Sequence, residues 1–108
     1  MMPTFVFVYR NPAGYVPAEE SAAPWLAWFE DMGEQLAEVG GPVVSRAAVG
    51  NCQDGATELG GYSLINAQDL ETAVTIAKGC PYLAAGGGVQ VGQVGEVPGP
   101  RPGGPRAS

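Results

Sequence analysis

The chain opens with an alternating apolar pattern that predicts a strand over residues 4–9. One face of this strand carries aromatic side chains and the other carries valines: Phe5, Phe7 and Tyr9 against Val6 and Val8. The strand is therefore apolar on both faces. Residues 10–17 are rich in turn-forming residues and are expected to leave the sheet.

The next apolar pattern has helical spacing. Large apolar residues recur at i, i+3, i+4, i+7, i+11 and i+14: Trp25, Trp28, Phe29, Met32, Leu36 and Val39. Pro24 suits the first helical position, and Gly40-Gly41-Pro42 would end the helix, so it is predicted over residues 24–39. Residues 43–49 predict a second strand, and Asp54-Gly55 is the sharpest hairpin signal after it.

Residues 60–91 predict a strand, a helix and a final strand. The strand spans residues 62–66, with Tyr62 and Leu64 on one face and Ser63 and Ile65 on the other. The helix is expected to start at a polar cap within residues 66–69. Its apolar face repeats at i, i+3, i+4 and i+7: Leu70, Ala73, Val74 and Ala77. Gly79 and Pro81 would end it, and Val89 and Val91 open the last strand.

The resulting order, β-α-β-β-α-β, is that of an α+β ferredoxin-like fold. This architecture is a four-stranded antiparallel sheet with two helices on one face. The strands over 4–9 and 62–66 are apolar on both faces, so the bare face would expose an apolar patch. We expect a second copy to cover it in a two-fold homodimer. The alternative is that the C-terminal tail or residues 11–23 cover it.

Composition and charge limit the classes of protein to which the chain can belong. The 108 residues suit one domain, taken as residues 1–97, followed by a flexible Pro/Gly-rich tail over 98–108 that lacks large apolar residues. The formal charge is −6, and residues 1–97 hold all 11 acids but only three of the five bases, a net of −8. Such a body repels phosphate, so neither nucleic acid nor an anionic membrane surface is an expected partner.

No metal or cofactor is expected. The chain has no histidine, and its two cysteines, Cys52 and Cys80, form no CxxC pair, which makes a zinc site improbable. Neither a signal peptide nor an apolar run long enough to span a bilayer is evident. We therefore expect a cytoplasmic protein with free thiols.

Short sequence blocks carry a family resemblance. They are Gly61-Tyr62-Ser63, Asp69-Leu-Glu-Thr-Ala-Val74, Ala77-Lys-Gly-Cys-Pro81, Ala85-Gly-Gly-Gly-Val-Gln-Val91, and, upstream, Trp25-Leu-Ala-Trp-Phe29 with Gly40-Gly-Pro-Val43. Over most of residues 3–97 the chain resembles the YCII-related domain family, especially its DGPF branch. The resemblance implies a ferredoxin-like domain that forms a dimeric α/β barrel through sheet-to-sheet packing. Some relatives pair a His with an Asp, and here the best matching positions hold Trp25 and Cys80.

Several side chains are candidates for a site. Arg10 and Arg46 are rare cations near strand ends that could bind a ligand carboxylate, although an ordinary surface ion pair is the favoured explanation for each. Tyr9, Tyr62 and Tyr82 could line a pocket, with Trp25, Trp28 and Phe29 as its wall, although all six also suit core packing. Cys80 and Tyr62 are the candidate proton donors or nucleophiles, but no histidine base exists to activate them. The carboxylates at Glu30, Asp31, Glu34 and Glu38 are interpreted as a solvated helix face.

Two functions follow from this pattern. The first is a small dimeric binding or accessory protein, which holds an apolar or aromatic molecule, carboxylated or not. The second is an enzyme acting on an aromatic compound, as a lyase, isomerase or cofactor-free oxygenase, with Arg10 or Arg46 orienting the substrate and Tyr62 or Cys80 moving a proton. An enclosed pocket into which Asp54, Glu58 or Cys80 points beside an arginine would favour the enzyme.

Overall fold

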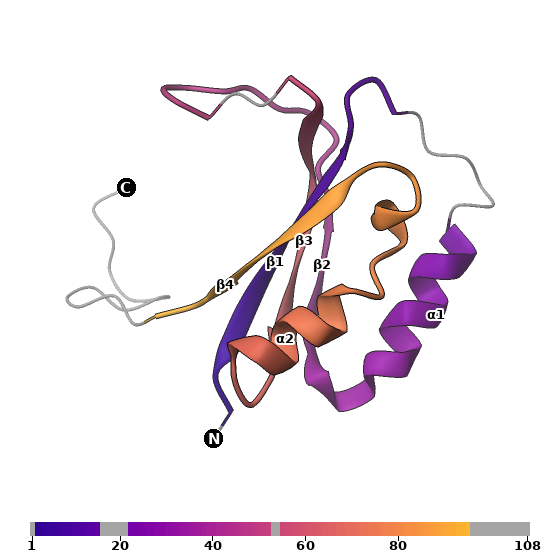
Figure 1. The fold of residues 1–108 in the computed structure, drawn as a ribbon, viewed down its shortest axis with the longest axis vertical. Helices are drawn as coiled ribbons and strands as arrows, with labels where there is room; N and C mark the ends of the chain where they lie inside the picture. The colour runs from indigo at the N-terminus through magenta and orange to yellow at the C-terminus, as the bar shows by residue number, and fades with distance from the viewer. Residues whose placement is uncertain (1, 16–21, 53–54, 96–108) are drawn as a thin grey trace.

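The described residues of the computed structural model, 2–15, 22–52 and 55–95, contain one four-stranded antiparallel sheet in the order β2-β3-β1-β4 (Figure 1). The strands are β1 (Thr4–Pro12), β2 (Leu36–Pro42), β3 (Thr57–Asn66) and β4 (Gly88–Gln93). Helices α1 (Ala22–Met32) and α2 (Leu70–Ala77) lie on the same side of the sheet, with short 3-10 turns η2 (Gly33–Gln35) and η3 (Pro81–Leu83) after them. The predicted ferredoxin-like α+β order is thus confirmed.

Strand β1 holds the centre of the core. Phe5 and Phe7 are fully buried and Tyr9 nearly so, which makes the aromatic face of the predicted strand the one that faces the core. The strand continues to Pro12 rather than ending at residue 9, because Arg10–Pro12 pair with Thr57–Leu59 of β3 beyond a bulge. Of the residues expected to leave the sheet, Arg10–Pro12 therefore lengthen the strand instead, and the chain leaves the sheet from Ala13.

The predicted helix over residues 24–39 is wrong in its second half. Helix α1 ends at Met32, and Gly33 adopts a φ of +56°, a left-handed conformation that stops a helix. Residues 36–42 then form the edge strand β2. Leu36 and Val39 continued the helical spacing only by coincidence, since a strand pairing with β3 accounts for them.

The strand predicted over residues 43–49 is also wrong. These residues lie in the loop between β2 and β3, and two of its three valines are exposed, Val44 at 89% and Val49 at 91%. The β2–β3 pairing replaces it in the sheet. The hairpin signal at Asp54-Gly55 falls partly outside the described residues, because Asp54 is not among them.

Strand β3 and helix α2 follow the predicted faces in part. Ser63 and Ile65 are fully buried while Tyr62 is 43% exposed, as the alternation required. Asp69 caps α2 by accepting hydrogen bonds from the Thr72 amide at 2.8 Å and from its hydroxyl at 2.7 Å, which lowers the pKa of the Asp69 carboxyl.

Only half of the predicted apolar face of α2 packs on the sheet. Ala73 and Ala77 are buried, but Leu70 and Val74 are exposed at 51% and 39%. The small alanines let the helix lie close to the sheet, and this turns the larger side chains outward. The last strand, β4, begins at Gly88, next to the predicted start, and pairs with β1.

The predicted tail over residues 98–108 lies outside the described residues. Both cysteines are free thiols, as expected, with Cys52 exposed and Cys80 buried. None of the described helices is long and apolar enough to cross a membrane.

A candidate aromatic pocket between helix and sheet

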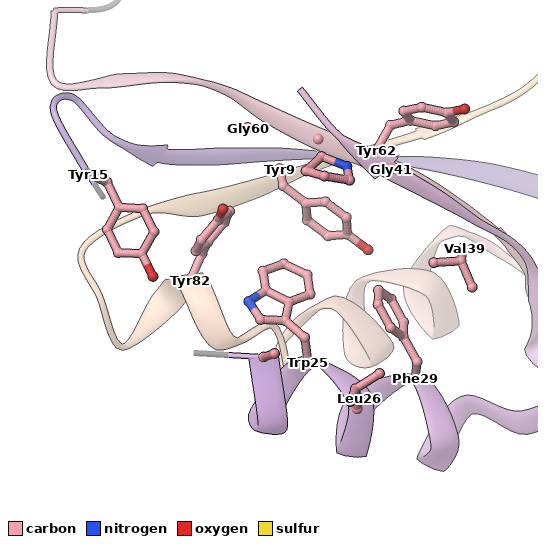
Figure 2. A pocket seen from close by; sticks show the side chains of 13 residues that line it. Tyr9, Tyr15, Trp25, Leu26, Phe29, Val39, Gly41, Gly60, Tyr62 and Tyr82 are labelled. Carbon is pink, nitrogen blue, oxygen red and sulfur yellow. The ribbon is translucent and has the colours of Figure 1, made fainter. Parts of the chain in front are cut away.

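A cavity of about 400 Å³ lies between α1 and the sheet (Figure 2). Its lining comes from β1, β2, β3, α1 and η3 together with the residues after β1. The lining residues are predominantly aromatic or apolar: Tyr9, Tyr15, Ala22, Trp25, Leu26, Phe29, Val39, Gly41, Pro42, Gly60, Gly61, Tyr62 and Tyr82. None of these described residues carries a charge at neutral pH. The cavity therefore suits an apolar molecule of small-ligand size.

Edge-to-face ring contacts set the shape of the pocket. The ring of Trp25 lies 4.8 Å from both the Tyr9 and the Tyr82 ring centroids, at interplanar angles of 80° and 79°. Tyr82 in turn meets Tyr15 at 5.6 Å. Such perpendicular pairs favour fixed ring orientations. The wall is therefore preorganised around Trp25.

Helix α1 is anchored beneath this wall by Trp28. Its indole Nε1 donates a hydrogen bond of 3.3 Å to the Ile76 carbonyl of α2, and its ring stacks on Phe7 of β1. Gly79 makes room for this contact, because a Cβ at that position would lie 2.8 Å from the Trp28 Nε1 atom. Gly79 does not adopt the left-handed conformation expected of a helix-ending glycine. Close packing accounts for it instead.

A buried hydrogen-bond chain crosses three neighbouring strands beside the pocket. The Tyr9 hydroxyl of β1 donates to Ser63 Oγ of β3 at 2.8 Å, and Ser63 Oγ donates to the Val39 carbonyl of β2 at 2.6 Å. Ser63 is fully buried and Tyr9 is 4% exposed. Burial raises the pKa of Tyr9 well above its ordinary value. The Ser63 hydrogen bond acts in the opposite direction, and nearby Cys80 adds a smaller upward contribution. This phenol is thus neutral at any physiological pH.

Tyr82 is likewise a neutral phenol. Its pKa is raised chiefly by burial and further by the neighbouring Tyr15 and Cys80, while the positive charge of Arg46 opposes the shift. The two tyrosines add polar edges to an apolar cavity without adding charge. Tyr15 and Tyr82 lie at one end of the pocket, and Val39 and Phe29 lie at the other (Figure 2).

The predicted ligand-binding residues separate in space. Tyr9 lies in the pocket, as do Trp25, Phe29 and Tyr82. Tyr62 also borders it, but its ring points to the opposite side of the strand in Figure 2, and its hydroxyl donates to Glu38 Oε2 at 3.3 Å. Of Tyr9 and Tyr62, only Tyr9 therefore faces the pocket.

The two predicted arginines do not line the aromatic pocket. Arg10 donates from Nε to Thr57 Oγ1 and from Nη2 to the Thr57 carbonyl, both at 3.2 Å. Arg46 donates to Glu58 Oε2 at 2.8 Å and also to the carbonyls of Leu59 and Val43. Both guanidinium groups thus hold the loop and strand ends of this chain together.

The candidate reactive residue Cys80 is 3% exposed and borders neither of the cavities described here. Burial raises the pKa of its thiol, although the amides of Tyr82 and Leu83 partly offset this effect. A raised pKa keeps sulfur in the less nucleophilic thiol form. Its position favours packing over catalysis.

A second cavity, of about 590 Å³, lies against β1, β3 and β4. It is lined by Arg10, Cys52, Thr57, Gly87, Gly88, Val89 and Gln90. It brings the exposed Cys52 near Arg10, a juxtaposition that sequence spacing did not reveal. Among the described residues, no group of three or more acidic or cysteine side chains is placed to hold a metal ion, and the acidic residues of α1, η2 and β2 are exposed.

Ser63, Val39 and Tyr15 belong to the site region although the sequence pattern does not indicate it. The alternation groups Ser63 with Ile65 on one strand face but does not show that this face is buried; a hydroxyl at an inward position beside Ile65 is a signal that it needs a buried partner. Val39 was assigned to a helix, so its carbonyl could not be connected with β3. Tyr15 also lines the pocket although it follows the expected strand.

The fold and the pocket define a small α+β ferredoxin-like domain with a preorganised aromatic cavity. The model of the YCII-related domain family matches residues 2–96, so the chain belongs to this family. A search of curated proteins gave no match.

Proposed function

We propose that this YCII-related protein binds a small apolar or aromatic molecule in the pocket between α1 and the sheet. The observation that carries the proposal is the cavity of about 400 Å³ whose described lining is aromatic, apolar and uncharged. A preformed cavity costs little ordering on binding, which favours affinity. Its volume lies within the range typical of small-ligand sites.

The position of the candidate catalytic groups supports binding rather than the alternative of an enzyme acting on an aromatic compound. Glu58 pairs with Arg46, Cys80 lies outside the pocket lining, and the Tyr62 hydroxyl bonds Glu38 on the other side of the sheet. Proton transfer requires an acid or base within hydrogen-bond reach of the substrate. The only described titratable groups lining the pocket are tyrosines, and burial raises the pKa of Tyr9 and Tyr82.

Naphthalene should raise the melting temperature of the protein in a concentration-dependent way, because a ligand that binds only the folded state stabilises it. Val39→Trp should weaken naphthalene binding at least about tenfold, or about 1.4 kcal/mol, because the larger ring occupies the Phe29 end of the pocket. Isothermal titration calorimetry gives the affinity. Val44→Trp, in the exposed loop, is the matched control and should bind naphthalene normally. A wild-type protein that does not bind naphthalene would contradict the proposal.

We also propose a homodimer formed through the sheet face that the helices leave open. This face carries Val6 and Val8 of β1 opposite Leu64 and Tyr62 of β3, and neither α1 nor α2 packs over it (Figure 1). Tyr62 is 43% exposed there. A second copy offers the same apolar surface, and isologous contacts are the commonest way to cover such a patch.

Light scattering should give twice the 11.1 kDa chain mass at micromolar concentration. Val8→Lys should reduce it to the single-chain mass, because the substitution places a charge in the apolar interface. Thr75→Lys, an equivalent charge on the exposed side of α2, should leave the dimer intact. A monomeric wild-type protein would refute the dimer while leaving the pocket proposal unaffected.

Two finer assignments complete the proposal. The blocks over residues 61–91 support placement in the DGPF branch of the family and in the dimeric α/β barrel superfamily. The two free thiols support a reducing, cytoplasmic environment, where cysteines stay reduced.

A further inference from the structure

The direction of the buried hydrogen-bond chain determines what Tyr9 offers to a ligand. The Val39 carbonyl can only accept, so the single Ser63 proton is committed to it at 2.6 Å. Ser63 Oγ must then accept from Tyr9 at 2.8 Å, which commits the single Tyr9 proton as well. The Tyr9 oxygen can therefore make a further hydrogen bond only as an acceptor.

This acceptor lies at the apolar end of the pocket. Figure 2 shows the Tyr9 ring above Trp25, with its oxygen directed toward Val39 and Phe29. Tyr9 lines the cavity although only 4% of its surface is exposed, so a ligand would meet only a small part of this side chain. A ligand donor group at that point gains a hydrogen bond, whereas a ligand acceptor group is repelled by the lone pair of the Tyr9 oxygen.

The charges around the pocket disfavour an anion. Arg10 is held by Thr57, and Arg46 is held by Glu58 and two backbone carbonyls. The positive charge of Arg46 acts on Tyr82, at the other end of the pocket from Val39, and Arg46 itself is paired with Glu58 at 2.8 Å. A buried carboxylate would lose its hydration without gaining a cationic partner among the lining residues.

We propose, resting on the function proposed above, that the pocket selects uncharged aromatic molecules carrying one hydrogen-bond donor, such as a phenol or an indole, and excludes aromatic carboxylates. Tyr9 is the residue that sets this specificity, and Ser63 orients it. The sequence suggested a carboxylated ligand held by an arginine, and the placement of Arg10 and Arg46 argues for the opposite preference.

Four naphthalene derivatives of similar size test the proposal by calorimetry. Naphthalene reports on the cavity alone, 2-naphthol adds a donor, 2-methoxynaphthalene presents the same oxygen as an acceptor only, and 2-naphthoate adds a negative charge. We expect 2-naphthol to bind about two- to tenfold more tightly than 2-methoxynaphthalene, the range for one net hydrogen bond. We expect 2-naphthoate to bind at least about tenfold more weakly than naphthalene.

Two variants connect the preference to the hydrogen-bond chain. Tyr9→Phe removes the acceptor and should bring the affinity ratio of 2-naphthol to 2-methoxynaphthalene to about one. Ser63→Ala releases the Tyr9 proton for donation to an ether oxygen, and should lower the same ratio below its wild-type value. Ser45→Ala, in the exposed loop, should leave the ratio unchanged. Because each ratio compares two ligands on one folded protein, changes in stability do not affect it.

The outcomes separate this inference from the proposed function. If naphthalene does not bind the wild-type protein, the proposed function fails and the inference fails with it. If naphthalene binds but 2-naphthol has no advantage, or Tyr9→Phe preserves that advantage, the inference alone is overturned. Tighter binding of 2-naphthoate than of naphthalene would also overturn it.

Discussion

Gly40→Ala is expected to destabilise the protein by about 2–5 kcal/mol. Gly40 adopts a φ of +73°, and an added Cβ would collide with the backbone carbonyl of Tyr62 on β3. A left-handed conformation costs a side-chain-bearing residue about 1–2 kcal/mol, and overpacking adds about 1–3 kcal/mol. Urea denaturation followed by circular dichroism measures the loss of unfolding free energy. In a thermal melt, the same loss should lower the melting temperature by at least about 10 °C.

The neighbouring Gly41 provides the control. Its φ is not in the left-handed region, and an added Cβ would meet no heavy atom within 4 Å. Gly41→Ala should therefore change stability by less than about 1 kcal/mol, with a small gain expected from the stiffer unfolded chain. Equal losses for the two variants would show that Gly40 is not conformationally required.

The irregular pairing around Gly40 matters for the pocket as well as for stability. Between Glu38 and Gly41 the β2–β3 register shifts, so that three steps along β2 match two along β3. The Val39 carbonyl in this irregular stretch accepts its hydrogen bond from Ser63. One glycine thus permits the bulge that places an acceptor for the polar chain behind Tyr9.

The sequence predicted the fold where one local pattern decides it. Alternation placed Phe5, Phe7 and Tyr9 together on one face of β1, which is the face that is buried, and the polar run before Leu70 correctly located the start of α2. It failed over residues 33–49, where apolar spacing fitted a longer helix. A glycine that stops a helix and one that is tolerated within it look alike in sequence, and pairing with a distant strand decided the outcome.

The sequence predicted the aromatic character of the candidate site but not which residues form it. Aromatic residues on β1 and α1 indicated a possible pocket, because large rings from two elements must meet across the core. Whether an arginine faces that pocket depends on the register of β1 with β3 and on the loop after β2, and neither is a local property. The same dependence concealed the link between Ser63 and Val39.

Phe7→Ala is expected to cause the largest loss of stability, about 3–5 kcal/mol, because it removes a fully buried ring from the centre of the sheet. Phe7 lies opposite Ser63 on one side and Val91 on the other, and it stacks with Trp28 at 6.2 Å between centroids. The cavity left behind would loosen the support of α1. Naphthalene affinity, measured by calorimetry, should therefore fall together with stability, measured by urea denaturation. Phe7→Leu refills much of the space and should lose less than half as much. If Phe7→Ala cost no more than the surface control Val44→Ala, within about 0.5 kcal/mol of wild type, the packing described for this core would be wrong.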